Sequence, residues 1–429
     1  MKKPLILFYP KNLPLLSKNE LEVLDLLMDA GKLIAPLYLE QEKQAELEIN
    51  KGELERAAKK NPAILDPHTV VEKVNGKIVV TPYHIKYAKL LKPVADKLIK
   101  ASKLTKNKDF GNILKLQAKA LTSGAYEEEA VAWLKIKKPY ILDTFIGPIE
   151  HFGGQLLFGK ASYQAWVGVL DKEGTDRLNN YKSVILSVRR KATLPDERVD
   201  NQDQVKARVL DVVLFSGFMA RAKFVGLHLP TDVSLVEKYG SELILFNQPN
   251  DLRIKEQIIP TFNKIFSKEF KEGFEAEDIR RGYLRAVALH ELAHSYLYYK
   301  HAARNLADLF PVIEELAATI LGLRLAGTLL LKDRINNKQL ESMIVTFLCR
   351  SFYHKGNADS SSPLKNYALG GNIFINFIVQ NGALKISGGQ VVPNFMKIFV
   401  SLHELSDSLE YLLEKGSYKD AQNFIKKYS

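Results

Sequence analysis

The feature that most constrains the fold is a change in hydrophobic periodicity along the 429 residues. From Ser17 to about Ala120, and again after Pro260, apolar residues recur every three or four positions, which is the spacing of amphipathic helices. Between Tyr140 and Asn250 the pattern changes to alternating or β-branched runs punctuated by Gly and Pro, which is typical of strands. The runs are YILDTFIGPIE, YQAWVGVLD, SVILSVRR, FVGLHLP and SELILFNQPND. Because one core rarely serves a chain of this length, the sequence predicts an α+β protein with two lobes, mostly helical.

The cysteine content and the apolar runs of the sequence indicate the cellular compartment. The single cysteine, Cys349, excludes intramolecular disulfides and Cys-rich metal clusters, which suits a reducing compartment. The opening MKKPLILFYPKN has only a short apolar run, interrupted by Pro4 and Pro10, so we expect no signal peptide. The apolar stretch after Glu315 is broken by Arg324 and is too short to span a bilayer. We therefore expect a soluble, cytoplasmic protein.

The net charge of +12 raises the question of a nucleic-acid partner, because lysines release counterions from phosphate. In the segment YAKLLKPVADKLIKASKLTKNKDF, however, the lysines alternate with leucine and valine, as on a solvated helix face. The sequence contains no zinc-finger, RNP-type or helix-turn-helix signature. We therefore expect no nucleic-acid partner and no membrane partner.

The segment HELAH carries the chemistry. His290 and His294 are four residues apart in a stretch with helical periodicity, so their imidazoles lie one turn apart on one helix face. Zinc prefers two such nitrogens plus a carboxylate, with a fourth position left to water, and Glu291 is placed to take a proton from that water. Chance produces this pattern in a chain of this composition about once in a hundred. The segment HELSD at His403 begins in the same way but lacks the second histidine, and we interpret it as a surface helix.

A third ligand is expected on the following helix, PVIEELAATILGLRLAG, which begins with Pro311 in its first turn. Glu314 and Glu315 both compete for this role. Glu315 shares a helical stripe with the apolar residues that should face the ligand helix, whereas Glu314 is offset by about 100°. We therefore prefer Glu315, and Glu314 can instead stabilise the helix N-terminus. The resulting prediction is a zinc hydrolase in which Glu291 is the general base.

Several segments taken in order resemble dipeptidyl peptidase III, the M49 metallopeptidase family, in its shorter bacterial form. They are TPYHIKYAKLLKPVADKL, LQAKALTSGAY, IGPIE, LLFGKASYQAWV, FNQPND, HELAH, EELAATILGL, YALGGNIFINFIVQNGALKI and GSYKDAQNFIKKY. The family's longer members carry HExxxH, whereas this chain has HExxH. The resemblance implies a zinc exopeptidase that releases dipeptides, with the second glutamate of EExxA, Glu315, as the third ligand.

The resemblance also implies substrate-binding residues. Glu150 of IGPIE, with Asn247 and Asn250 of NQPN, matches the residues that hold a peptide's free N-terminus and backbone, and a carboxylate facing an ammonium group is a favourable pair. The alternative is structural, because Asn-x-Pro-Asn is also an ordinary turn and Glu150 can end a strand.

Three positions depart from the family pattern. Thr319 replaces the acid that orients a ligand histidine. Phe152 replaces a tyrosine whose hydroxyl donates to the developing oxyanion, and loss of such a donor slows catalysis by orders of magnitude. Tyr367 replaces a histidine near the bound peptide, and it either donates in its place as a catalytic residue or packs as an ordinary tyrosine.

These features together predict a helical N-terminal region over 1–139, a barrel-like β-rich substrate-binding region over 140–255 and a helical zinc-binding catalytic region over 256–429, with a cleft between the lobes. The leading hypothesis is a dipeptide-releasing exopeptidase. A second is a zinc aminopeptidase or hydrolase of different specificity, motivated by the three departures. A third is a peptide-binding protein that retains zinc with little turnover, against which Glu291 argues, because a binding protein has no need of a base.

Overall fold

The computed structural model describes residues 3–11, 13–45, 51–136, 139–149, 160–189, 206–230, 233–297, 299, 301–355 and 362–429. The chain forms two compact units, each assembled from separate stretches of sequence. The first comprises Met1–Lys172, Val209–Phe224 and Phe246–Gln248, and the second comprises Glu173–Arg208, Val225–Leu245 and Pro249–Ser429. Helices dominate and strands are concentrated between residues 142 and 246, which confirms the predicted α+β class with a β-containing lobe and a helical lobe.

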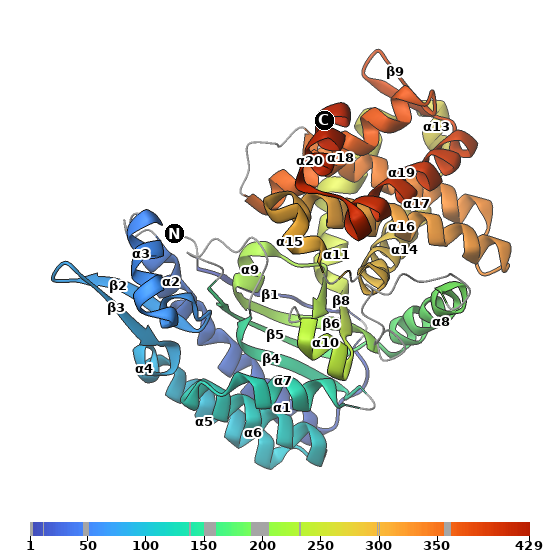
Figure 1. The fold of residues 1–429 in the computed structure, drawn as a ribbon. Helices are drawn as coiled ribbons and strands as arrows, with labels where there is room; N and C mark the ends of the chain where they lie inside the picture. The colour runs from blue at the N-terminus through green and yellow to red at the C-terminus, as the bar shows by residue number, and fades with distance from the viewer. Residues whose placement is uncertain are drawn as a thin grey trace. The chain divides into compact units, whose positions relative to one another are not determined.

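The first unit packs helices against an antiparallel sheet (Figure 1). Its helices are α1 (Lys18–Lys32), α2 (Ile34–Ala45), α3 (Lys51–Lys60), α4 (Tyr83–Lys86), α5 (Ala88–Leu104), α6 (Lys108–Ser123), α7 (Tyr126–Leu134) and α9 (Phe218–Ala222), with a 3₁₀ turn at Pro62–Leu65. Its strands are β1 (Leu5–Leu7), β2 (Thr69–Val74), β3 (Lys77–Pro82), β4 (Leu142–Ile149), β5 (Ser162–Leu170) and most of β6 (Lys206–Gly217).

Strand β5 lies between β4 and β6 in this sheet, and all but the last of its residues are buried. It pairs antiparallel with β4, from Leu142 opposite Val169 to Ile149 opposite Ser162, and with β6 on its other side. Strand β1 pairs with β6. Helices α1 and α6 contact the sheet, and their apolar faces join β4 and β5 in one hydrophobic core. Burial on both faces explains why β5 reads as a nearly continuous apolar run.

The hairpin of β2 and β3 turns at Asn75-Gly76. The register places Val74 opposite Lys77, and both turn residues have positive φ, 49° at Asn75 and 77° at Gly76. Two positive φ angles define a type I′ turn, whose twist matches that of the strands it joins, and Asn-Gly is its preferred sequence.

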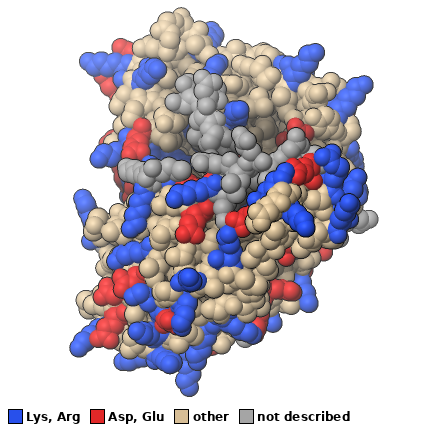
Figure 2. Space-filling model, turned by 90° about the vertical axis from the view of Figure 1, so that its left-hand side faces the viewer, with Lys and Arg blue, Asp and Glu red and all other residues tan. Residues whose placement is uncertain are grey.

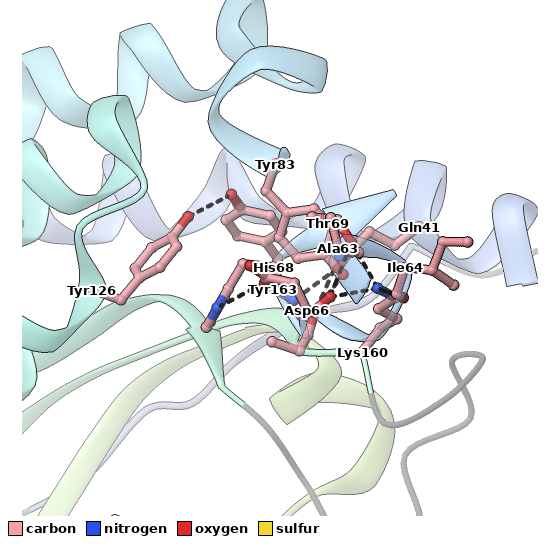
Figure 3. A network of polar contacts seen from close by, with 11 residues as sticks. Gln41, Ala63, Ile64, Asp66, His68, Thr69, Tyr83, Tyr126, Lys160 and Tyr163 are labelled. Atoms are coloured by element: carbon pink, nitrogen blue, oxygen red, sulfur yellow. Dashed lines mark hydrogen bonds and ion pairs between the residues drawn. The ribbon is translucent and has the colours of Figure 1, made fainter. Parts of the chain in front are cut away.

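Lys160, which is buried just before β5, contacts the residues that lead into this hairpin (Figure 3). The Lys160 ammonium donates to the backbone oxygens of Ile64 (2.7 Å) and Asp66 and to Oγ1 of Thr69 (2.7 Å). Its three donors are therefore matched by three acceptors. Burial lowers the pKa of Lys160 to about 8, although the charge of Asp66 opposes the shift.

The second unit contains a helical bundle and two short hairpins. Its helices are α8 (Lys172–Arg189), α10 (Val233–Tyr239), α11 (Asn247–Arg253), α12 (Ile259–Ile265), α13 (Lys268–Glu272), α14 (Ala276–Tyr296), α15 (Ala302–Leu306), α16 (Phe310–Leu331), α17 (Asn337–Lys355), α18 (Ser362–Gln380), α19 (Phe395–Lys415) and α20 (Tyr418–Tyr428), with a π-helical turn at Ile254–Ile258 and a 3₁₀ turn at Ala307–Leu309. Its strands pair as β7 (Gly226–Leu229) with β8 (Glu242–Phe246) and β9 (Leu384–Ser387) with β10 (Gln390–Pro393).

Helix α14 is at the centre of the bundle and contacts α16, α17 and β7. Helix α16 is almost entirely apolar and is buried around most of its circumference, as expected of a helix inside a core. Pro311 lies in its first turn, as the sequence predicted. His403 of the HELSD segment is exposed on α19, which agrees with its interpretation as part of a surface helix.

One of the strands predicted from the alternating and β-branched runs is wrong. The run SVILSVRR was expected to be extended, but the structure continues α8 as far as Arg189. Between Gly174 and the end of the helix at Arg189 the sequence contains no Gly or Pro. A helix that begins at Lys172 therefore continues through Val184, Ile185 and Val188. The helix propensity of β-branched residues is only slightly below average, and an established helix overrides it.

The basic charge is dispersed over the surface. On the face shown in Figure 2, Lys and Arg are interspersed with Asp and Glu. In α5, Lys89, Lys92, Lys100 and Lys103 are exposed while Leu91, Val94 and Leu98 are buried, which confirms the solvated helix face predicted from the sequence. Among the described residues, no helix combines the length and the apolar composition needed to cross a membrane.

Candidate metal centre

Two neighbouring helices position the candidate ligands. Helix α14 begins with a capping box between Glu275 and Asp278 and continues without interruption through His290 and His294. One helical turn therefore separates the two imidazoles, whose ring centroids are 4.6 Å apart. Helix α16 brings Glu315 to the same place from its second turn.

Three ligand atoms converge in this site. Nε2 of His290 and Nε2 of His294 are 3.1 Å apart, and Oε2 of Glu315 lies 3.4 Å from the first and 4.0 Å from the second. Around a tetrahedral zinc ion with ligand bonds near 2.0–2.1 Å, neighbouring ligand atoms are separated by about 3.3 Å. The three separations therefore fit one ion bound by the residues on which the sequence prediction settled.

The other nitrogen of each histidine has its own partner. Thr319 donates its hydroxyl to the backbone oxygen of Glu315 (3.1 Å), so Oγ1 accepts from Nδ1 of His290 (2.9 Å). Nδ1 of His294 donates to Oε1 of Glu314 in a short contact. Protons on both Nδ1 atoms leave both Nε2 lone pairs free for a metal. Thr319 thus supplies the orienting contact that its departure from the family pattern put in question, and Glu314 orients His294.

The donor set needs a cation at its centre. Two unprotonated nitrogens at 3.1 Å repel each other, and Oε2 of Glu315 is buried without a hydrogen-bond donor. Burial lowers the pKa of His290 to about 4, which keeps this imidazole neutral. Burial opposes charge on His294 as well, yet Glu314 raises its pKa to about 10, so without a metal this residue takes up a proton. A divalent cation satisfies the same demand, and imidazoles with a carboxylate suit zinc.

Two glycines that the sequence analysis did not assign to the site allow its close packing. A Cβ on Gly322 of α16 would lie 2.9 Å from the backbone nitrogen of His290. A Cβ on Gly226 of β7 would lie 2.8 Å from Oε1 of Glu291. These approaches are closer than a side chain permits, so only glycine lets α16 and β7 pack directly against the ligand helix. A single sequence contains no signal that distinguishes these glycines from those in turns.

Glu291 is 8% exposed and lies beneath β7. Burial raises its pKa to about 7, although the positive charge of His294 acts in the opposite direction. A carboxylate with a pKa near neutrality accepts and releases a proton readily at neutral pH, as a general base and acid must.

Comparison with known proteins shows what this chain is similar to. The model of peptidase family M49 matches residues 3–187, which are less than half of the chain. The whole fold aligns with a structure titled DPP III from Caldithrix abyssi. That alignment has a TM-score of 0.84 and 19% identity, and it covers 98% of this chain and 91% of the other. The chain therefore shares this fold, and its N-terminal part is similar to peptidase family M49.

Two further relatives extend the comparison. A structure titled dipeptidyl-peptidase III from Corallococcus sp. strain EGB aligns with a TM-score of 0.78 and 19% identity over 98% of this chain and 90% of that one. "Nudix hydrolase 3" of Arabidopsis thaliana is 23% identical over 363 residues, which are 82% of this chain and 46% of that protein. The chain thus spans about half the length of this curated relative.

The remaining candidate residues have different surroundings. Asn247 begins α11 in the first unit and donates to Asp171 (3.0 Å) and Asp211 (3.1 Å). Asn250 is 2% exposed in the second unit and donates to the backbone oxygen of Val225 (3.0 Å). The NQPN segment therefore forms a first helical turn. Glu150 and Phe152 lie outside the described residues.

Tyr367 lies on α18, with its ring stacked on His354 at 5.8 Å. Burial raises its pKa, and the nearby carboxylates of Glu315 and Glu291 act in the same direction. The phenol therefore remains protonated, and its electrostatic coupling to these two residues places it near the metal centre. The guanidinium of Arg350, which the sequence analysis did not single out, lies over the same ring.

Proposed function

We propose that this protein is a zinc peptidase, similar to peptidase family M49, that releases dipeptides from the N-termini of peptides. The observation that carries the proposal is the convergence of His290, His294 and Glu315 on one tetrahedral set of ligand positions, next to a buried carboxylate on the same helix. Helices α14 and α16 hold all four side chains, so the geometry does not depend on a loop.

The roles follow from the surroundings of each residue. His290, His294 and Glu315 would hold the ion, which when bound supplies Lewis-acid polarisation of the scissile carbonyl and acidifies its water. Glu291 takes the proton of the attacking water on a carboxylate oxygen and later delivers it to the leaving amine. Thr319 and Glu314 fix the two imidazole orientations through their Nδ1 contacts.

Dipeptide release is supported by the two dipeptidyl-peptidase III folds and by the sequence matches at Glu150, Asn247 and Asn250. We propose that these three residues bind the N-terminal dipeptide of the substrate. The contacts of Asn247 to two aspartates also support a structural role, so its amide oxygen is the atom we assign to the peptide. The name of the Arabidopsis relative refers to a different hydrolase chemistry, and we do not extend it to this chain. A cytoplasmic location remains a prediction.

A comparison of wild type with Glu291→Gln tests the proposal, with both proteins loaded with zinc, incubated with a peptide mixture and analysed by mass spectrometry. Glu277→Gln is the matched control, because Glu277 is on the same helix but half-exposed and paired with Arg281. We expect wild type and the control to release N-terminal dipeptides, and Glu291→Gln to retain zinc while losing about 10²–10⁴-fold in rate.

Other outcomes select the alternatives. Single residues or internal cuts would indicate a zinc aminopeptidase or hydrolase of different specificity. Equal inactivity of wild type and Glu291→Gln, with zinc retained, would indicate a zinc-retaining peptide-binding protein. Failure of wild type to bind one zinc ion per chain would overturn the proposal altogether.

A further inference from the structure

Arg350 is an unpaired cation on α17. Among the described residues, no carboxylate forms an ion pair with it, whereas Arg324 pairs with Asp407 at 2.7 Å and the buried Arg208 with Glu242 at 2.8 Å. Its guanidinium carbon instead lies 4.6 Å from the centre of the Tyr367 ring. A cation over an aromatic face is held in place while its N–H groups stay available to another acceptor.

The packing of α17 against α14 brings Arg350 to the metal centre. The two helices approach closely at Gly282, where a Cβ would lie 2.7 Å from the backbone of Ser342. Arg350 lies eight residues after Ser342, and His290 lies eight residues after Gly282, so both residues are about two helical turns beyond this close approach. Burial is the largest influence on the pKa values of Glu291, Glu315 and His290, and the positive charge of Arg350 is a smaller influence that acts to lower all three, as expected of a cation near them.

A cation in this position can stabilise the negative charge that develops during peptide hydrolysis. Attack on a peptide carbonyl transfers negative charge to the carbonyl oxygen, and a fixed donor aimed at that oxygen stabilises the transition state more than the ground state. The position of the phenolic donor seen in the family pattern is Phe152, which has no hydroxyl. The sequence thus lacks this phenolic donor, and among the described residues the guanidinium of Arg350 lies over Tyr367 without an ion pair.

We propose that Arg350 donates hydrogen bonds to the developing oxyanion of the scissile carbonyl, and that the Tyr367 ring positions its guanidinium. This inference rests on the proposed peptidase function. Water oxygen bonds to the carbonyl carbon as the C=O π pair moves onto oxygen, and Glu291 takes the water proton. When the C–N bond breaks, that proton goes to the amine, and Arg350 stays protonated throughout. Tyr367 is then a positioning residue.

The first test separates kcat from KM. We expect Arg350→Met to lower kcat on a tetra-alanine peptide by about 10²–10³-fold with KM within a few-fold of wild type. Arg350→Lys keeps the charge without the planar fork, so it should recover part of the loss. Arg324→Met is the matched control, an arginine of the same unit whose partners are Asp407 and Glu410, and it should retain wild-type kinetics.

The second test uses binding instead of turnover. The probe is a phosphinic analogue of tetra-alanine in which PO₂–CH₂ replaces the second peptide bond, so that its anionic oxygens mimic the oxyanion. Arg350→Met should weaken this probe by about 10²-fold or more, while tetra-alanine should bind equally well to Glu291→Gln with and without Arg350→Met. Zinc content, measured on every variant, should stay at one ion per chain.

Tyr367 variants test the positioning role. Tyr367→Phe keeps the ring beneath the guanidinium, so it should retain kcat within about 10-fold, whereas Tyr367→Ala should approach the Arg350→Met defect. Equal kcat and probe affinity in Arg350→Met and Arg324→Met would overturn the inference, as would a defect confined to KM. Inactivity or absence of zinc in wild type would instead overturn the proposed function, so the two failures are distinguishable.

Discussion

The two units each contain a buried polar cluster, and the clusters differ in how their hydrogen-bonding atoms are used. Around Lys160 in the first unit, three N–H donors meet three oxygens, so the cluster is complete without any further group (Figure 3). Around His290 in the second unit, the Nε2 atoms of two imidazoles lie 3.1 Å apart, and Oε2 of Glu315 beside them has no hydrogen-bond donor. A saturated cluster stabilises the fold, whereas an unsaturated one needs a ligand.

The largest expected effect comes from removing a ligand from the unsaturated cluster. His294→Ala should weaken zinc binding by about 10³-fold and abolish peptide hydrolysis, because one of three protein ligands is lost. Isothermal titration of metal-free protein with zinc would measure the loss. Lys160→Met is the control from the other cluster and should bind zinc like wild type. Equal zinc affinity in His294→Ala and wild type would show that the ion binds elsewhere.

The saturated cluster should respond to mutation through stability. Lys160→Met removes the charged donor from the backbone oxygens of Ile64 and Asp66 and from Oγ1 of Thr69, so we expect a loss of about 2–4 kcal/mol in the free energy of unfolding. Urea denaturation followed by circular dichroism would measure it. Lys119→Met is a control, because that lysine is exposed and paired with Glu128 at the surface. If both substitutions changed stability equally, the buried contacts of Lys160 would contribute nothing.

The orienting contacts at the metal centre should have a smaller effect than the ligands. Glu314→Gln removes the carboxylate that fixes His294, and Thr319→Val removes the acceptor that fixes His290. Each should weaken zinc binding by about 10–100-fold without changing the number of ions bound. Zinc competition with a chromophoric chelator would measure the affinity. A loss from Glu314→Gln as large as that from Glu315→Gln would contradict the division between ligand and orienting residue.

The sequence predicted those parts of the molecule that depend on local pattern. Pro311 predicted the start of α16. Helical phase favoured Glu315 over Glu314 as the third ligand, and the structure places Glu315 beside both imidazoles, although its role as a ligand stays a prediction. The pattern failed in α8, where a propagating helix overrode β-branched residues. It also missed Gly226, Gly322 and Arg350, because their roles arise from contacts between helices and strands far apart in the sequence. Such contacts leave no periodic signal in a single chain.

Buried carboxyl groups extend the comparison and give the smallest expected effect. Glu129 on α7 of the first unit is 5% exposed, and its Oε1 has no hydrogen-bond partner, whereas Glu315 in the second unit has two imidazoles beside it. Burial raises the pKa of Glu129 to about 7, although a hydrogen bond with Gln117 opposes the shift. With an unfolded pKa near 4.5, the folded state alone holds this proton between about pH 5 and pH 7.

The raised pKa of Glu129 makes the stability of the fold depend on pH. Because the folded state binds more protons in that window, the contribution of Glu129 to stability falls as the pH rises and is constant above about pH 8. Glu129→Gln should therefore stabilise the protein by about 1–2 kcal/mol at pH 8 and have almost no effect at pH 4.5, since glutamine resembles the neutral acid. Urea denaturation at the two pH values would measure it. An equal effect at both would mean that the carboxyl has the same pKa in the folded and unfolded states.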